Sequence, residues 1–234
     1  MAPGLSRILV LGKAFWFNSL LIHASQAHLI SNRRPVNRES NAKEAAAPAD
    51  SEASDLARKK ERLAAIIRCQ SLLLNRDFVL VSGRSSNFFF DMKKTMLDPE
   101  GATLLADLLF DNIRAEDVDY IGGLETGAIP IIAALCVRSW PEKPLRGFFV
   151  RKEVKGHGTD QRIDGLLEKG MNVILFEDVT TTGGSALQAV TQARQFGCEI
   201  VKVVSVVDRL EGAEENFRAA GIRFEALFTW RDFS

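Results

Sequence analysis

Apolar residues in the first globular part of the chain recur at helical spacing. From Leu56 to Leu74 they fall on one helical face, which predicts a helix. The positions that carry this pattern are Leu56, Leu63, Ile66, Ile67 and Leu74. A second helix is predicted from Pro99, because proline is favoured in the first helical turn and apolar Leu104, Leu105, Leu108 and Leu109 follow.

Further along, short apolar runs alternate with helical stretches. The predicted extended segments are Phe78–Leu80, Ser86–Phe90, Val118–Ile121, Arg146–Val150, Val173–Phe176, Ile200–Val207 and Phe224–Phe228. The predicted helices among them are Gly127–Val137, Ser185–Phe196 and Ala213–Ala220. Apolar strands that alternate with helices are typical of an α/β fold whose parallel sheet is flanked by helices on both faces.

The composition changes near residue 55. Residues 1–38 carry basic residues and no acid, and their apolar run Ile8–Ile22 is too short for a membrane span. An organelle-targeting peptide, a secretory signal and untranslated sequence upstream of the true start site are the alternatives. Residues 39–55 are rich in alanine, serine and acids and predict a disordered linker. We therefore expect an extension over residues 1–55 and one domain over residues 56–234.

Composition excludes several classes of function. The 234 residues include 30 basic and 30 acidic side chains, so no general nucleic-acid footprint is expected. Cys69, Cys136 and Cys198 form no CxxC pair, which argues against a disulfide framework or a zinc site. His157 is the one histidine beyond the extension, so it is the sole candidate there for histidine chemistry.

A strand that ends in two acids before a hydroxyl-rich turn is the most informative motif. Glu177 and Asp178 follow the apolar run, and the turn Thr181–Ser185 leads into a predicted helix. Gly183 and Gly184 allow backbone N–H groups to approach an anion, and the helix dipole favours a phosphate there. The acids would repel that phosphate, so ribose hydroxyls and Mg2+ are their natural partners. A simple helix N-cap is the alternative, but it explains only one of these residues.

A basic loop follows the predicted strand Arg146–Val150. Its cationic or protonatable groups, flanked by Gly156 and Gly158, are Arg151, Lys152, Lys155 and His157. A solvated surface loop is the alternative. However, the strand directs the loop toward the sheet edge that carries the phosphate turn. There the loop would neutralise a departing pyrophosphate and exclude water from the reacting centre.

These two motifs together resemble the orotate phosphoribosyltransferases, a family with the type I phosphoribosyltransferase fold. The acid pair with its Thr/Gly turn resembles the phosphoribosyl pyrophosphate signature of that fold. The spacing of Arg151, Lys152, Lys155, His157 and Gly158 resembles the catalytic loop of the orotate enzymes. The resemblance covers residues from about 56 to 234. It implies a small hood subdomain built from N- and C-terminal segments, and a homodimer in which loop 151–160 reaches the neighbouring subunit's site.

Three further segments fit the same family. Ser82–Asp91 resembles a segment whose aromatic residues, here Phe89 and Phe90, flank the orotate ring. Gly122–Pro130 resembles the turn that holds pyrophosphate, with Thr126 and Gly127 as the contacts. Val207–Gly212 resembles a strand end whose arginine, here Arg209, pairs with the orotate carboxylate. For Arg209 the alternative is a surface salt bridge with Glu211.

The resemblance implies transfer of ribose 5-phosphate from phosphoribosyl pyrophosphate to orotate in pyrimidine synthesis. Lys152, Lys155, His157 and Asp178 are the expected catalytic residues. Arg151, Glu177, Thr126, Gly127 and the turn Thr181–Ser185 would bind phosphoribosyl pyrophosphate. Phe89, Phe90, Thr181 and Arg209 would bind orotate. Mg2+ is the expected cofactor, carried mainly by the diphosphate, with no firm protein ligand.

The chain departs from the family at two positions that often carry lysine, here Val81 and Thr126. We hypothesise that Lys93 or Lys94 supplies part of the missing charge. A purine phosphoribosyltransferase and a non-catalytic regulator that binds phosphoribosyl pyrophosphate remain as alternatives. A cytoplasmic location is expected, with no membrane or nucleic-acid partner, unless residues 1–38 direct the chain to an organelle.

Overall fold

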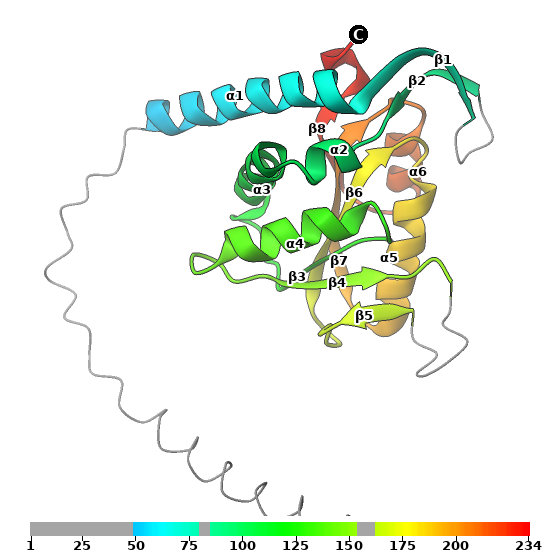
Figure 1. Ribbon diagram of the computed structural model, residues 1–234. Coiled ribbons are helices and arrows are strands. Elements are labelled where there is room, and N and C mark those ends of the chain that lie inside the picture. The colour runs from blue at the N-terminus through cyan, green and yellow to red at the C-terminus, as the bar shows by residue number, and fades with distance from the viewer. Residues whose placement is uncertain (1–48, 80–84, 154–161) are drawn as a thin grey trace, which may run out of the picture. The chain divides into compact units, whose positions relative to one another are not determined.

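A six-stranded sheet forms the centre of the protein in the computed structural model, which describes residues 49–79, 85–153 and 162–234 (Figure 1). Its strands are β3 (Tyr120–Gly122), β4 (Arg146–Val150), β5 (Ile163–Gly165), β6 (Asn172–Thr180), β7 (Glu199–Asp208) and β8 (Phe224–Thr229), in the order β5-β4-β3-β6-β7-β8. All neighbours run parallel except β4 and β5. The predicted α/β fold with a parallel sheet is confirmed.

Strand β6 is longer than its apolar run. Pairing with β7 continues through Glu177 opposite Ser205 and Thr180 opposite Asp208, so both acids of the motif lie within the strand. The antiparallel edge strand β5 was not predicted, because the three residues Ile163–Gly165 present no apolar run. Backbone hydrogen bonds to β4, rather than a hydrophobic pattern, hold β5 in the sheet.

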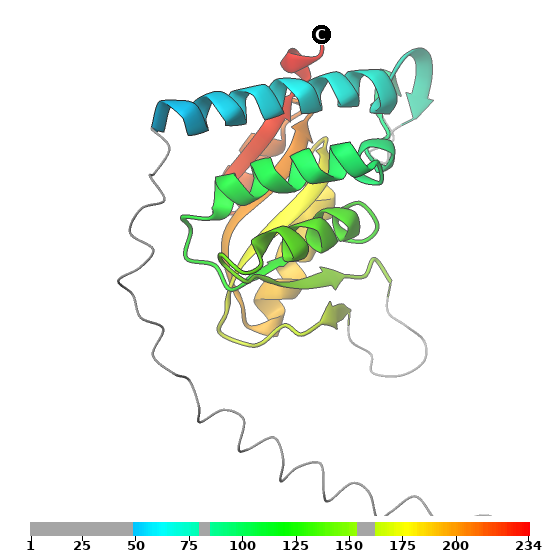
Figure 2. The same cartoon turned by 60° about the vertical axis from the view of Figure 1, so that its left-hand side comes forward.

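Helices cover both faces of the sheet. Helices α3 (Pro99–Ile113) and α4 (Ala128–Ser139) pack on one face, and α5 (Gly184–Phe196) and α6 (Ala213–Ala219) lie on the other (Figures 1 and 2). Helix α3 begins as predicted, with Pro99 in its first turn and the Asp98 side chain accepting a hydrogen bond from the amide of Gly101. None of the described helices is both long enough and apolar enough to cross a membrane.

Helix α1 (Ala49–Ile66) packs along α3 and corrects two expectations. The predicted disordered linker is wrong for residues 49–55, which form the start of the helix: acids are favourable near a helix N-terminus, and Glu52 pairs with Arg114. The predicted continuation to Leu74 is also wrong. The helix widens into the π-turn η1 (Ile67–Ser71), and Leu72 then pairs with Phe90 in a strand.

A small hood lies beside the main sheet. Strands β1 (Leu72–Val79) and β2 (Ser85–Phe90) form a separate antiparallel pair, followed by the short helix α2 (Lys93–Met96). The C-terminal turn η2 (Trp230–Asp232) packs its aromatic side chain against β2, so the predicted hood of N- and C-terminal segments is confirmed. Residues 1–38 and the turn Ser82-Gly83-Arg84, for which the sequence made predictions, lie outside the described residues.

Candidate active site

The candidate site lies where the chain leaves the central strands in opposite directions. The connection after β3 leads to β4 on one side, and that after β6 leads to β7 on the other, so a crevice opens at the carboxyl ends of β3 and β6. A cavity of about 580 Å³ occupies this crevice. Its walls come from β2, α2, the turn after β3, the start of the basic loop, β6 with its turn, and the end of β7.

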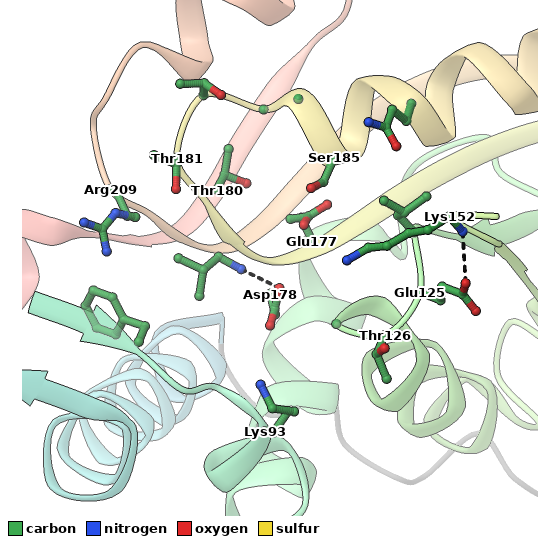
Figure 3. A pocket seen from close by; sticks show the side chains of 18 of the residues that line it. Lys93, Glu125, Thr126, Lys152, Glu177, Asp178, Thr180, Thr181, Ser185 and Arg209 are labelled. Carbon is green, nitrogen blue, oxygen red and sulfur yellow. Dashed lines mark hydrogen bonds between the residues drawn. The ribbon is translucent and has the colours of Figure 1, made fainter. Parts of the chain in front are cut away.

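The two acids of β6 point to opposite sides of the strand, as neighbouring strand residues do. In Figure 3, Glu177 lies toward Ser185 and Asp178 toward Thr126. Burial and the charge of Asp178 raise the pKa of Glu177 to about 8, and its Oε2 is buried without a hydrogen-bond partner. Burial also raises the pKa of Asp178, against the opposing effect of a hydrogen bond from the Val179 amide.

Two lysines approach this acid pair from different elements. Lys152, after β4, lowers the pKa of both acids through its charge, and Lys93, in α2, does so for Asp178. Their side chains extend into the cavity in Figure 3. Lys94, the other lysine of the hypothesis, is not among the cavity-lining residues. The structure therefore distinguishes the two: Lys93 has the placement that the hypothesis requires.

The turn after β6 presents the start of α5 to the cavity. Gly183 has a φ of 82° and a side chain there would meet the ring of Phe217 at 2.8 Å, so the turn requires glycine. No side chain caps the N-terminus of α5. Its first amides and the hydroxyl groups of the turn thus face a cavity suited to an anion. The predicted residues Thr181, Thr182, Gly183, Gly184 and Ser185 all line it.

The turn after β3 forms the opposite wall. Thr126 and Gly127 line the cavity as predicted, and the peptide bond between Glu125 and Thr126 is cis. A Cβ atom at Gly127 would lie 2.4 Å from Oδ1 of Asp178. Any other residue at this position would clash with the Asp178 carboxylate, so glycine is required here.

Arg209 lies at the end of the cavity near the hood. Its side chain is only 1% exposed, and its Nε donates to Glu211 at 2.8 Å. Nη1 donates to the carbonyl of Phe88 at 3.3 Å and Nη2 to the hydroxyl of Ser86 at 2.8 Å. The ion pair proposed as the alternative for Arg209 exists, but it is buried beside the cavity rather than on the surface. Each terminal nitrogen still carries a second N–H for a ligand.

The other predicted residues divide into three groups. Phe89 and Phe90 line the cavity, with Phe90 only 3% exposed and Phe89 stacked on Phe78. Arg151 is not among the lining residues, because its guanidinium pairs with Asp164. Lys155 and His157 lie outside the described residues.

Five residues of the cavity wall were not among the predicted contacts: Leu124, Glu125, Val179, Thr180 and Gln188. Glu125 immediately precedes the predicted contact Thr126, and its carboxylate accepts a hydrogen bond from the Lys152 amide. Gln188 lies on α5 three residues after Ser185, on the same helical face. Helical spacing from Ser185 was the signal that would have identified Gln188. For Glu125 the sequence held no signal for the contact with Lys152.

The described residues contain no cluster of three or more histidine, cysteine, aspartate or glutamate side chains placed to hold a metal ion. Glu177 and Asp178 are the two carboxylates at the β6 end of the cavity. A pair of carboxylates with one unpartnered buried oxygen fits a metal that retains other ligands, but not a closed protein cage.

Comparison with known proteins gives a consistent result. No protein-family model matches the chain. The orotate phosphoribosyltransferase of Rhodopseudomonas palustris (strain TIE-1) is 48% identical over 179 residues, covering 74% of this chain and 95% of that protein. The orotate phosphoribosyltransferase of Aquifex aeolicus is 41% identical over 173 residues, covering 73% of this chain and 94% of that protein.

Solved structures agree. Orotate phosphoribosyltransferase from Aeropyrum pernix has a TM-score of 0.62 at 34% identity, covering 73% of this chain and 95% of that one. The Mycobacterium tuberculosis enzyme in complex with 5-phospho-α-D-ribosyl 1-diphosphate has a TM-score of 0.62 at 29% identity, covering 76% and 92%. Adenine phosphoribosyltransferase of Leishmania tarentolae, at 18% identity and a TM-score of 0.53, shares the fold.

The parallel sheet, the acidic end of β6 and the uncapped phosphate turn define a type I phosphoribosyltransferase. Within that class, the chain belongs to the orotate phosphoribosyltransferase family, since relatives of that name are 48% identical over nearly their whole length.

Proposed function

We propose that the protein joins orotate to phosphoribosyl pyrophosphate, forming orotidine 5′-phosphate and diphosphate in pyrimidine synthesis. One observation carries the proposal. The acid pair and phosphate turn of β6 share a single cavity with Arg209, a buried guanidinium that has N–H groups to spare. The first two features suit a phosphoribosyl group and the third suits a planar base that bears a carboxylate.

The phosphate turn sets the orientation of the sugar. The 5-phosphate lies on Thr181–Ser185, where it accepts hydrogen bonds from hydroxyl groups and from the amides at the start of α5. The ribose then lies over the end of β6, with its hydroxyls on Glu177 and Asp178. This arrangement gives the unpartnered Oε2 of Glu177 a donor.

The base occupies the hood side of the cavity. Arg209 donates to the orotate carboxylate with the N–H groups left on Nη1 and Nη2. Phe89 and Phe90 limit the space around the ring, and Thr181 contacts both substrates. Holding the base nitrogen near the C1 carbon of the ribose provides the proximity that this reaction requires.

The reaction forms a bond from the base nitrogen to C1, breaks the bond from C1 to the diphosphate oxygen, and releases the proton of the base nitrogen. Charge accumulates on the leaving diphosphate as C1 gains oxocarbenium character. Lys152 extends into the cavity of its own subunit, and we assign Arg151, Lys155 and His157 to the diphosphate in the neighbouring subunit's cavity. Catalysis is electrostatic and positional, with no covalent intermediate on the protein.

We propose Mg2+ as the cofactor, carried mainly by the diphosphate. Mg2+ retains water and phosphate ligands, which fits a site where, among the described residues, no three ligating side chains cluster together. When bound, it would neutralise part of the diphosphate charge. We assign it no protein ligand.

We also propose a homodimer in which loop 151–160 serves the neighbouring site. The observation that supports this assignment is the placement of Arg151. Its guanidinium pairs with Asp164 on β5 and is not among the residues that line the cavity. In the dimer, Lys152 would act in its own cavity, while Arg151 and the rest of the loop would act on the partner's substrate.

A cytoplasmic location follows from the proposed pathway, whose substrates are made inside cells. Organelle targeting by residues 1–38 is the alternative. A fluorescent protein fused to residues 1–55 distinguishes them: diffuse fluorescence supports the first and fluorescence confined to an organelle supports the second.

The deciding experiment follows orotate by its absorbance, with phosphoribosyl pyrophosphate and Mg2+, for the wild type and Lys155→Ala. Mg2+-dependent loss of orotate in the wild type, strongly slowed in the variant, is expected. Turnover of a purine base in place of orotate would overturn the assignment of orotate as the substrate. Binding of phosphoribosyl pyrophosphate without turnover of any base would instead indicate a regulator.

A further inference from the structure

Three side chains from distant parts of the chain form one stack at the hood. The Phe88 ring lies parallel to the Trp230 indole, with 3.8 Å between ring centres and 10° between planes. The Arg209 guanidinium carbon lies 4.0 Å from the centre of the same Phe88 ring. Two groups so close to one ring cannot share a face. Phe88 is therefore enclosed between Trp230 and Arg209.

The position of Arg209 depends on β2. Two of its three hydrogen-bond partners, the Phe88 carbonyl and the Ser86 hydroxyl, belong to that strand, and the third is Glu211. Strand β2 is outside the main sheet and pairs with β1 alone. The main sheet thus does not fix β2 by strand pairing, and side-chain packing must do so.

The C-terminal turn η2 supplies that packing. Trp230 contacts Phe88 face to face and Phe90 edge to face, with 6.1 Å between the latter ring centres. The turn itself is held by a capping box between Thr229 and Asp232. It is also tied to η1, because Arg68 donates to the carbonyl of Asp232 at 2.8 Å. Trp230 is therefore a fixed platform for β2.

We propose that Trp230 is a positioning residue for the base: through Phe88 it holds the Arg209 guanidinium in the orientation that receives the substrate carboxylate. The inference rests on the proposed function. Trp230 is not among the residues that line the cavity, so its effect is transmitted through Phe88. Loss of the indole removes one face of the Phe88 enclosure, and Phe88 and Arg209 can then move together away from the carboxylate.

Trp230→Leu and Trp230→Phe form the test, because both side chains are smaller than indole and only Phe retains an aromatic face against Phe88. We expect Trp230→Leu to raise the KM for orotate roughly three- to tenfold while the KM for phosphoribosyl pyrophosphate stays near the wild-type value. Trp230→Phe should restore most of the orotate affinity. Phe228→Leu is the stability control, because Phe228 belongs to the same aromatic cluster but pairs its ring with Phe233 and is not part of the Trp230–Phe88–Arg209 stack.

A general loss of structure would lower kcat, or raise both KM values, in Trp230→Leu and Phe228→Leu alike. That result, or equal orotate KM values for the Leu and Phe variants at position 230, would overturn the inference. The proposed function fails separately, because it requires the wild type to consume orotate. A wild type that consumes orotate beside a Trp230→Leu variant with unchanged KM would refute only the role of Trp230.

Discussion

The backbone amide of Lys152 donates a 2.9 Å hydrogen bond to the side-chain carboxylate of Glu125. Two backbone bonds join the same segments: the Glu125 amide to the Val150 carbonyl at 2.9 Å, and the Val150 amide to the Gly123 carbonyl at 2.8 Å. The start of the basic loop is thereby fixed to the turn after β3. This attachment places the Lys152 side chain in the cavity (Figure 3).

Glu125→Ala is expected to lower kcat/KM for phosphoribosyl pyrophosphate roughly three- to tenfold, since a lost hydrogen bond costs about 1 kcal/mol and frees Lys152. Glu125→Gln keeps an acceptor oxygen and should remain close to wild type. Steady-state kinetics of the three proteins check this. Equal losses in both variants would mean that the charge of Glu125, and not its hydrogen bond, matters.

Lys93→Ala is expected to raise the KM for phosphoribosyl pyrophosphate several-fold, because Lys93 extends into the cavity toward Asp178. Its side chain is 56% exposed and pairs with Asp91 at 2.9 Å, so the effect should be modest, about three- to tenfold. Initial rates at varied phosphoribosyl pyrophosphate, with orotate saturating, provide the measurement.

Lys94→Ala is the matched control for that experiment. Lys94 is exposed, adjacent in sequence and absent from the cavity wall, so the KM of the Lys94→Ala variant for phosphoribosyl pyrophosphate should stay near the wild-type value. If Lys94→Ala and Lys93→Ala behave alike, the effect is one of general surface charge. If neither single variant nor the double variant changes the KM, the hypothesis that α2 replaces the charge missing at Val81 and Thr126 is wrong.

Glu177 should make the stability of the ligand-free protein depend on pH. Its folded-state pKa of about 8 lies above its ordinary value of 4.5, so the folded chain retains a proton that the unfolded chain has lost. Its contribution to the free energy of unfolding therefore falls as pH rises from about 4.5 to about 8, and then levels off.

Glu177→Gln removes this titration. We expect the variant to be more stable than the wild type by roughly 2 kcal/mol near pH 8.5 and by much less near pH 5, measured by urea unfolding without ligands. The exposed residue Glu153, changed to Gln, is the control. A difference between Glu177→Gln and wild type that is the same at both pH values would contradict the raised pKa.

Mixed dimers test the sharing of loop 151–160. Lys155→Ala has a damaged loop, and Asp178→Asn has a damaged strand end. If loops cross, a hybrid dimer has one intact site, and an equal mixture after subunit exchange should recover roughly one quarter of wild-type activity. If each loop serves its own subunit, every site in the mixture is damaged. Activity would then stay at the level of the separate variants.

Local sequence determined the parts of the site that lie within one segment. The apolar run before Glu177, the glycines of the turn and the helix after it are contiguous, so residue type and spacing predicted them together. The same holds for strand β4, whose predicted bounds Arg146–Val150 are confirmed. In each case the residues that decide the conformation are near neighbours in the chain.

Sequence pattern misjudged the places where a distant partner decides the conformation. Leu74 continues a helical pattern, but pairing with Phe88 in β2 makes it part of a strand. Arg151 pairs with Asp164, because β5 returns beside β4, and no local pattern indicated that contact. In both cases the partner lies on another strand, and the pairing of strands is not part of a hydrophobic period.

The sequence by itself determined the fold class, the phosphate turn and the residue types of the site, because these depend on local pattern and on chemistry. Only the tertiary structure decided that Ser86 and Phe88 hold Arg209, and that Trp230 supports them from the far end of the chain. These contacts join residues more than one hundred positions apart. Their geometry follows from how the hood packs on the sheet, which no local pattern encodes.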